Sequence, residues 1–406
     1  MNDRSNFYPA NRPTGEADFG PLQRPGDEAA GIEVTEDFER FNQRNDMFSR
    51  AFWDERIISK DTESFFASYR MEAMPRKADG FTQKDFALRN AAWSVADDYA
   101  DRNNGNGVRE GFQDPFIARL PPAKDRVEVT SIDEMTAEIK KIAKLFGADL
   151  VGICDYDERW LYASRTDAQN FEEKQNILPE GLKNVIVIAH EMNWDLCQSY
   201  PSALAGAAVG IGYSGEAKTV LQLSNYIQNL GYEAVASMND TALVIPYAVK
   251  AGLGEYGRNQ MVITEEFGPR VRFAKIFTNL PLIHDQPKKF GVREFCNVCS
   301  RCADECPPKA LPYGPPNSGG ENQSAAKGVV KWTANCEKCF GYWAKLKTDC
   351  AICLRVCPYN KDFSKWWFRL GRNLAATSLR KLILRLDTKL GLWKRHKPKD
   401  WWSSNV

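Results

Sequence analysis

The sequence has few histidines, no long hydrophobic run and almost no net charge. Its 406 residues carry 54 Lys and Arg against 53 Asp and Glu, a formal net charge of +1. No overall field therefore attracts nucleic acid, and we expect no nucleic-acid partner. No apolar run reaches about 18 residues, the usual minimum for a transmembrane helix. The three histidines are far apart in the sequence, which disfavours a haem or non-haem iron site; they are His190, His284 and His396.

Three further motifs are absent. No Gly-x-Gly-x-x-Gly follows an apolar run, so a Rossmann nucleotide site is not expected. No Asp-x-His-x-x-Gly run supplies the lower histidine ligand of a base-off corrinoid. The N-terminal residues contain neither a twin arginine nor the apolar segment of a signal peptide. We expect either a cytoplasmic protein or one from which a signal has been removed.

The middle of the chain has the pattern of a mixed α and β core. A capping box at Ser131 and Glu134 predicts an amphipathic helix that ends at Gly147. Apolar runs at 150–154 and 185–189 predict buried strands, as do residues 260–264 and 271–278. Residues 202–230 and 242–251 predict helices. The first is rich in small residues, which admit either a large ligand or a closely packed helix.

These patterns predict an α+β fold with four regions. Residues 1–120 form an aromatic-rich segment that caps the core. Residues 121–287 form the core, with an insertion near 155–182. Residues 288–362 hold most of the cysteines, and 363–406 form a basic tail.

The strongest motif is the cysteine pattern. Nine of the 11 cysteines lie between Cys296 and Cys357, which favours metal binding over disulfides. The first run has the C-x2-C-x2-C-x3-C-P spacing of two-cluster ferredoxins, in which the fourth cysteine binds the other 4Fe-4S cluster. The second run also closes on Cys-Pro. The predicted ligands of cluster 1 are Cys296, Cys299, Cys302 and Cys357, and those of cluster 2 are Cys339, Cys350, Cys353 and Cys306.

Other interpretations of the cysteines are weaker. A structural zinc site needs four ligands and does not explain two interleaved runs. Cys336 is the alternative to Cys339 as a ligand, whereas Cys154 and Cys197 suit small core residues. Because clusters only transfer electrons, the upstream core must hold the centre that they reduce.

Several blocks resemble the corrinoid-dependent reductive dehalogenases. They are GYS at 212–214, MNDTA at 238–242, AGLGEYGRN at 251–259, FGPRVR at 267–272, KCFGYW at 338–343, and DCAIC at 349–353 with CPYNK at 357–361. The resemblance covers roughly residues 180–362, in the family's order. It implies a nitroreductase-like core that encloses a base-off, cobalamin-type corrinoid, and a ferredoxin-like domain that delivers electrons to cobalt. It also favours Cys339 over Cys336.

The resemblance also implies roles for single residues. Tyr213 matches the proton-donating tyrosine, Arg272 the arginine beside it, and Asn239 the asparagine that orients the substrate. Trp343 resembles a pocket-lining aromatic, with Tyr342 as the alternative. A guanidinium beside a phenol stabilises the phenolate, so Arg272 is expected to tune Tyr213. Without the resemblance, a hydrogen-bonded tyrosine, a salt-bridged arginine and a core tryptophan would explain these residues.

The tail has its own charge. Residues 361–406 carry 12 Lys and Arg against 3 acidic residues. Leucines at helical spacing, flanked by tryptophans, predict a basic amphipathic helix that either contacts a membrane surface or packs on the protein. Respiratory members of the family imply export with signal removal, a place at the outer face of the cytoplasmic membrane, and a small integral anchor protein. A cytoplasmic location and a homodimer are further hypotheses.

Two rival functions remain from the sequence. An epoxyqueuosine reductase shares the core and the clusters but would add a tRNA-binding surface after them. A non-enzymatic iron-sulfur carrier would hold no corrinoid. The favoured substrate is a small chlorinated organic compound, a chlorinated alkane first and chlorinated ethenes next.

Overall fold

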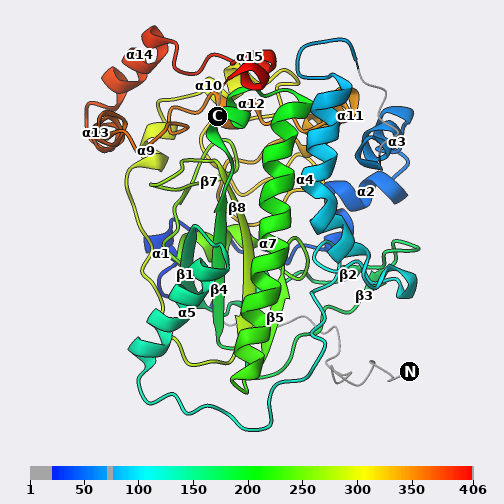
Figure 1. Ribbon diagram of the computed structural model, residues 1–406. Helices are drawn as coiled ribbons and strands as arrows, with labels where there is room; N and C mark the ends of the chain where they lie inside the picture. The colour runs from blue at the N-terminus through cyan, green and yellow to red at the C-terminus, as the bar shows by residue number, and fades with distance from the viewer. Residues whose placement is uncertain (1–20, 71–75, 405–406) are drawn as a thin grey trace.

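The computed structural model describes residues 21–70 and 76–404 (Figure 1). Its centre is a four-stranded sheet in the order β1-β4-β8-β5, and every neighbouring pair is antiparallel. The strands are β1 (Leu150–Asp155), β4 (Asn184–Glu191), β8 (Val271–Thr278) and β5 (Ala234–Ser237). The predicted mixture of helices and strands is therefore confirmed, and the strands predicted at 150–154, 185–189 and 271–278 are β1, β4 and β8.

Helices cover both faces of the sheet. Helices α5 (Ile132–Phe146) and α7 (Ala203–Asn229) pack on one face through residues such as Ile186 and Ile276, which pair in register. Helix α8 (Val244–Lys250) covers the other face with Val185, Val187 and Phe277. Alternation of buried side chains along each strand produces these two cores. The region predicted as a strand at 260–264 contributes only the short strand β7 (Val262–Ile263), paired with β6 (Glu255–Tyr256).

The insertion at 155–182 forms no large unit. It contains the 3-10 turn η5 (Glu158–Trp160) and a small hairpin of β2 (Arg165–Thr166) and β3 (Glu173–Lys174). The N-terminal part supplies α1 (Asp27–Ala30), α2 (Met47–Trp53), α3 (Lys60–Ala67) and α4 (Gln83–Asp101), with short 3-10 turns between and after them. Helix α4 runs beside α7, as Figure 1 shows.

The close approach of α4 to α7 decides between the two explanations of the small residues in α7. A Cβ built on Gly210 would lie 2.6 Å from Trp93 Cδ1 and 3.0 Å from the Ala92 backbone. Close packing of α4 on α7 therefore explains some of the small residues in α7. This is one of the two explanations that the sequence allowed.

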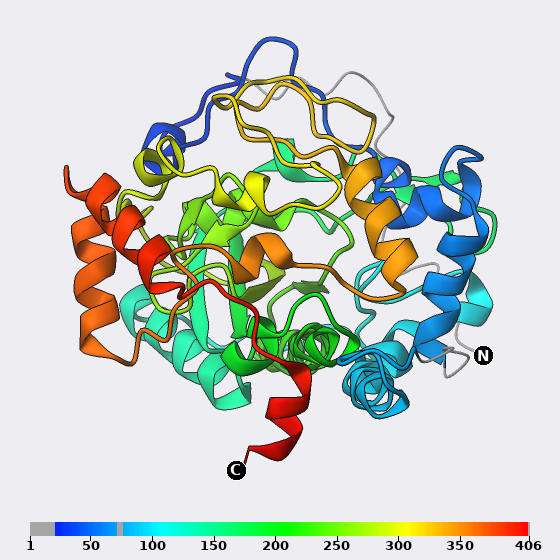
Figure 2. The same ribbon diagram turned by 90° about the horizontal axis from the view of Figure 1, so that it is seen from above.

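The cysteine region lies at one end of the sheet as short helices joined by loops (Figure 2). These are α9 (Val292–Cys296), α10 (Arg301–Asp304), α11 (Cys336–Leu346) and α12 (Ile352–Arg355). The tail forms three helices where the sequence predicted one: α13 (Trp366–Ala375), α14 (Arg380–Leu390) and α15 (Pro398–Ser403). None of the helices in the described part of the chain has the length and apolar character needed to cross a membrane.

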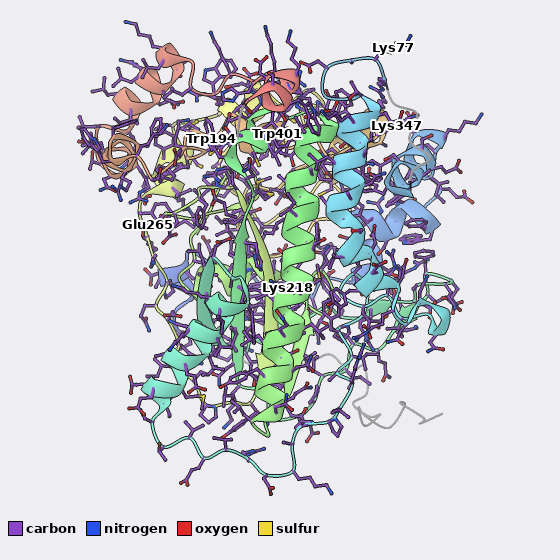
Figure 3. All side chains as sticks on the ribbon, viewed as in Figure 1. Lys77, Trp194, Lys218, Glu265, Lys347 and Trp401 are labelled. Carbon is purple, nitrogen blue, oxygen red and sulfur yellow. The ribbon has the colours of Figure 1, made fainter. Side chains whose placement is uncertain are left out.

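The tail helices take two different positions. Helix α15 lies against α6 (Trp194–Gln198), where Figure 3 shows Trp401 beside Trp194. Trp402 donates a hydrogen bond to Asp85 Oδ1 of α4 at 2.8 Å. Helices α13 and α14 instead form one edge of the molecule, opposite α2 and α3 (Figure 2).

Candidate active site and cluster-binding residues

Tyr213 is buried in the middle of α7 between an aromatic ring and a guanidinium. Trp93 of α4 stacks on it with ring centroids 4.5 Å apart and an interplanar angle of 30°. The Cζ atom of Arg272 lies 3.7 Å from the centroid of the Tyr213 ring. These contacts fix the plane of the phenol ring, so its hydroxyl has a defined direction.

The three predicted catalytic residues lie together. Asn239, which follows β5, donates a hydrogen bond from Nδ2 to the Tyr213 hydroxyl at 2.8 Å. Arg272 comes from β8, and its side chain crosses α7 at Gly212. A Cβ on Gly212 would lie only 2.6 Å from Arg272 Cγ. Glycine at this position is therefore what lets the arginine reach Tyr213.

The surroundings of Tyr213 act on its acidity in opposite directions. Burial raises the pKa of Tyr213 above its usual value, whereas the positive charge of Arg272 and the hydrogen bond from Asn239 lower it. The net direction is upward, so the phenol stays protonated at neutral pH. Arg272 thus has the predicted direction of effect, but burial outweighs it.

Glu216 is a residue that the sequence did not single out. It lies one turn after Tyr213 on α7, is fully buried, and has no hydrogen-bond partner for either carboxylate oxygen among the described residues. Its Oε1 atom lies 3.6 Å from Arg272 Nε. Burial raises the pKa of Glu216 to about 7, although Arg272 and Lys275 lower it. The sequence signal that could have identified Glu216 is an acidic residue within the run of small residues in α7.

Unpaired buried polar atoms also lie around the beginning of α7, where Thr348 and Asp349 approach Gly206. They include the Tyr200 hydroxyl, Thr348 Oγ1 and Asp349 Oδ2, none of which has a hydrogen-bond partner within the described residues. The carboxyl group of Asp349 is close enough to raise the pKa of both Tyr200 and Tyr213. Folded proteins pair nearly all buried polar atoms. The concentration of unpaired atoms here fits a bound ligand that is rich in polar groups.

The first predicted cysteine set lies together. Cys296, Cys299, Cys302 and Cys357 line one cavity. Burial raises the pKa of Cys296 to about 12 and raises that of Cys357 well above its usual value. Such thiols become thiolates only beside a strong positive charge, which cluster irons supply. No three His, Cys, Asp or Glu side chains in residues 21–70 and 76–404 meet as ligands of a single metal ion.

The second set also lies together, and it includes Cys339. Cys339 packs in one cluster with Cys306, Cys350 and Cys353, and its electrostatic neighbours are Cys350, Cys336 and Cys306. Cys336 packs in a different cluster, with Phe65 and Phe340, and its Sγ atom is 3.7 Å from the Ala334 carbonyl oxygen. This placement supports Cys339 as the fourth ligand. Cys154 and Cys197 are buried away from both sets, in core clusters.

Arg258 holds the first cysteine set in place. Its backbone N–H approaches Cys296 Sγ at 3.5 Å, and its guanidinium donates to the carbonyl oxygens of Cys296 and Cys299. The same guanidinium reaches the carbonyl of Gly314 at 2.9 Å. The hydrogen bonds of the buried Arg258 thus connect its own loop to the loop that carries Cys296 and Cys299.

The two predicted pocket aromatics lie elsewhere in the packing. Trp343 and Tyr342 are on α11 and pack with the second cysteine set, whereas Tyr213 belongs to the core cluster between α7 and the sheet. Trp343 lies 6.2 Å from Phe48, and Phe340 lies 5.5 Å from the same ring, measured between centroids. The N-terminal aromatics therefore cover α11. The substrate-pocket role of Trp343 and Tyr342 stays a prediction.

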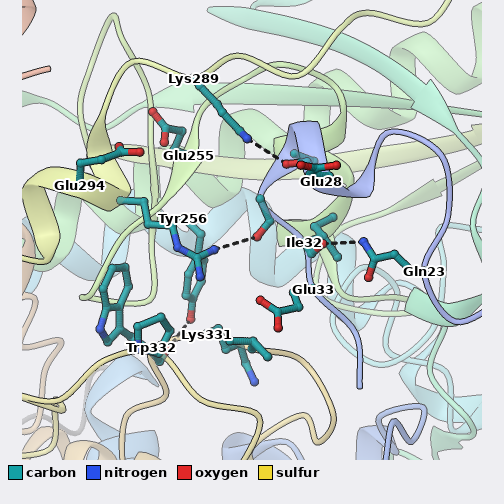
Figure 4. Close-up of a pocket in the computed structure, with 15 residues that line it drawn as sticks. Gln23, Glu28, Ile32, Glu33, Glu255, Tyr256, Lys289, Glu294, Lys331 and Trp332 are labelled. Carbon is teal, nitrogen blue, oxygen red and sulfur yellow. Dashed lines mark hydrogen bonds between the residues drawn. The ribbon is translucent and has the colours of Figure 1, made fainter. Parts of the chain in front are cut away.

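A separate cavity of about 580 Å³ opens between the N-terminal segment, β6 and the loop before α11 (Figure 4). Its polar groups are largely used within the wall: Lys289 donates to the Glu28 carbonyl at 2.9 Å, and the Tyr256 hydroxyl to the Trp332 carbonyl at 2.9 Å. None of the residues that line it belongs to the Tyr213 group or to the cysteine sets. This cavity is therefore not the candidate active site.

Comparisons with known proteins concern the chain as a whole. No family model matches the chain. The tetrachloroethene reductive dehalogenase of Dehalobacter restrictus is 32% identical over 368 residues, which cover 74% of this chain and 67% of the relative. An epoxyqueuosine reductase of Cyclobacterium marinum is 28% identical over 261 residues, 58% of this chain and 82% of the relative.

A solved structure shows the same fold. The catabolic reductive dehalogenase NpRdhA superposes with a TM-score of 0.69 and 22% identity over 95% of this chain, which corresponds to 50% of NpRdhA. The chain thus spans about two thirds of the length of the curated dehalogenases that it matches, with 67% and 63% for two of them.

Proposed function

Because the chain belongs to the reductive dehalogenase family of oxidoreductases, we propose that it replaces a halogen by hydrogen in a small organohalide. The reaction takes up two electrons and one proton and releases a halide ion. The observation that carries this proposal is the buried Tyr213, which is protonated, hydrogen-bonded to Asn239 and covered by Arg272.

The residues present fit the cofactors of such a reaction. Two sets of four cysteines, held mainly by α9 to α12, suit two 4Fe-4S clusters. The unpaired polar atoms of Tyr200, Thr348 and Asp349 suit the amide-rich edge of a corrinoid. When bound, the corrinoid supplies the low-valent cobalt that cleaves the carbon–halogen bond.

The protein's own residues manage the proton. Tyr213 donates it from its hydroxyl to the substrate carbon. The resulting phenolate is stabilised by the Arg272 guanidinium and by the Asn239 amide, which stay in place through the step. Trp93 keeps water from one face of the ring. We expect Asn239 also to contact the halogen end of a substrate near the same hydroxyl.

The substrate class is a finer proposal. The sequence favoured a chlorinated alkane, with chlorinated ethenes next, and the first relatives carry the name of an ethene, tetrachloroethene. Apolar and aromatic walls select small chlorinated compounds by dispersion and size. A competition assay with one chlorinated alkane and tetrachloroethene at equal concentrations ranks the two classes by chloride release.

The decisive experiment measures cofactors and chloride together. We expect one corrinoid and about eight irons per chain in the purified protein, and chloride release from the preferred substrate with reduced viologen. Iron without corrinoid would favour the electron-carrier alternative. Corrinoid with reduction of epoxyqueuosine in tRNA and no chloride release would favour the epoxyqueuosine reductase alternative.

Location and partners follow the same resemblance. We expect export with removal of a signal, a place at the outer face of the cytoplasmic membrane, and an integral anchor protein. Fractionation of the native cells with protease protection separates this from a cytoplasmic location. The mass of the purified protein in solution distinguishes a homodimer from a monomer.

A further inference from the structure

Helix α14 has one face fixed against the protein. Ile383 and Leu384 pack on the cluster formed by Val292 and Phe295. The buried Asp387 forms ion pairs with Arg301 and with Lys361, the latter at 3.0 Å. Because an apolar contact and a buried ion pair both hold this face, the rotation of α14 about its own axis is set.

The outer face of α14 is apolar and exposed. Leu382, Leu386 and Leu390 follow one another at four-residue spacing and are 49%, 46% and 68% exposed. Residues spaced in this way form one stripe along a helix. A basic stripe of exposed side chains runs directly beside it; it consists of Lys381, Arg385 and Lys389.

Helix α13 repeats this combination. Trp366, Trp367 and Leu370 are 64%, 50% and 48% exposed, and Lys365 and Arg369 are exposed beside them. Helices α13 and α14 contact each other and lie side by side at one edge of the molecule (Figures 1 and 2).

We call the exposed apolar and basic side chains of α13 and α14 the tail face. The tryptophans of α15 differ from those of α13, because Trp401 and Trp402 pack against a core cluster. Single exposed leucines are ordinary on protein surfaces, but several exposed leucines and two exposed tryptophans on two adjoining helices indicate an interaction surface.

We propose that the tail face docks on an anionic lipid bilayer. Tryptophans favour the boundary between headgroups and acyl chains, and leucines of an interfacial helix lie just below it. The flanking lysines and arginines then meet lipid phosphates. A second copy of this chain fits less well, since the two faces would bring like charges together. The proposal goes beyond the dehalogenation reaction and does not depend on it.

The test uses the full-length holoprotein and vesicles of two compositions. One contains phosphatidylcholine alone, and the other contains about one third phosphatidylglycerol. We expect co-sedimentation with the anionic vesicles only, weakened at high salt because ions screen the attraction. The exposed tryptophans should shift their fluorescence to the blue on binding, and Trp366→Phe with Trp367→Phe should reduce this shift.

Two variants separate the apolar and the charged contributions. Leu382→Gln with Leu386→Gln should lower the vesicle affinity at least tenfold. Lys381→Gln, Arg385→Gln and Lys389→Gln together should lower it about a hundredfold at low salt, since each charge contributes about fivefold. Matched controls lie on α5: Leu145→Gln, at a leucine that is 75% exposed, and the pair Lys141→Gln with Lys144→Gln. The controls should bind as the parent does.

Several results would overturn the proposal. They are equal binding to both vesicle types, no binding to either, and binding that the tail-face variants leave unchanged. Concentration-dependent dimerisation that the leucine variant abolishes would assign the face to a second copy. Retention only on membranes that contain an integral partner protein would assign it to that partner. Dehalogenation with a soluble electron donor should be equal in all variants, so a failure of docking is distinct from a failure of the proposed reaction.

Discussion

The cysteine sets and the Tyr213 group are built in different ways. All eight predicted ligands lie between positions 296 and 357, and short helices and loops hold them. The Tyr213 group draws Trp93 from α4, Tyr213 and Glu216 from α7, and Arg272 from β8. The first site depends on the identity of its donor atoms, whereas the second depends on how the core elements pack. Substitutions should therefore remove cofactor from the first and change proton chemistry or stability in the second.

The largest effect is expected from removal of a cluster ligand. Cys353→Ala should lower the iron content from about eight to about four per chain and abolish turnover, because the electron path is broken. Iron analysis and electron paramagnetic resonance of the reduced protein measure the loss. Cys336→Ala is the matched control, since Cys336 lies among Asp46, Lys331 and Arg50. If Cys336→Ala lost iron and Cys339→Ala did not, Cys336 and not Cys339 would be the ligand of cluster 2.

Tyr213→Phe should change the other site without changing its cofactors. Turnover should fall by about 10² to 10⁴ because the proton donor is gone, while iron and corrinoid contents stay the same. Tyr226→Phe, on the same helix with its hydroxyl bonded to Glu138, should keep full activity. Unchanged turnover in Tyr213→Phe would mean that the proton comes from another group.

The two regions also differ in what could be predicted. Seven of the eight predicted ligands followed from spacing, because thiolates at fixed intervals wrap a cluster wherever the loop lies, whereas the choice of Cys339 over Cys336 needed the family resemblance. The helix that ends at Gly147 followed from its capping box and its glycine. Trp93 could not be found, because it stacks on a ring 120 positions later and its own helix carries no mark of that contact.

Charged residues that the fold buries were equally difficult to predict from the sequence. Glu216 and Arg258 look like ordinary charged residues in the sequence, and only the fold shows that both are almost fully buried. Tail helices α13 to α15 were predicted as one helix, because leucine spacing continues across the break between α13 and α14. Local patterns thus specify elements and local ligand sets, whereas contacts between distant segments need the fold.

Glu216 should make stability depend on pH in the Tyr213 region. Its folded pKa of about 7 lies above the ordinary glutamate pKa of 4.5, so the unfolded chain loses the proton first. Stability due to this group therefore falls as pH rises from about 4.5 to 7, by about 3 kcal/mol. Glu216→Gln should remove most of this fall. Urea unfolding midpoints at pH 5 and pH 8 measure it.

The exposed Glu138→Gln on α5 is the control for Glu216→Gln, and its pH dependence should match that of the parent. An equal fall in Glu216→Gln would show that another group titrates. Turnover of Glu216→Gln should change only a few fold, because the carboxylate acts on Tyr213 through Arg272.

Gly212→Ala should have the smallest effect on stability, and it tests the packing of the core most directly. A Cβ there would lie 2.6 Å from Arg272 Cγ, so the arginine must shift away from the Tyr213 ring. We expect a loss of about 1–3 kcal/mol in stability and about tenfold in turnover. In contrast, Gly341 on α11 has no atom within 4 Å of a built Cβ, and Gly341→Ala should stabilise its helix by about 0.5–1 kcal/mol. Because both glycines lie inside helices, helix propensity alone predicts a gain in each. A loss at Gly212 and a gain at Gly341 would show that close approach of Arg272, and not helix propensity, determines the residue beside Tyr213. A gain at both would mean that Arg272 can move without cost, and its place over the phenol would then be accidental.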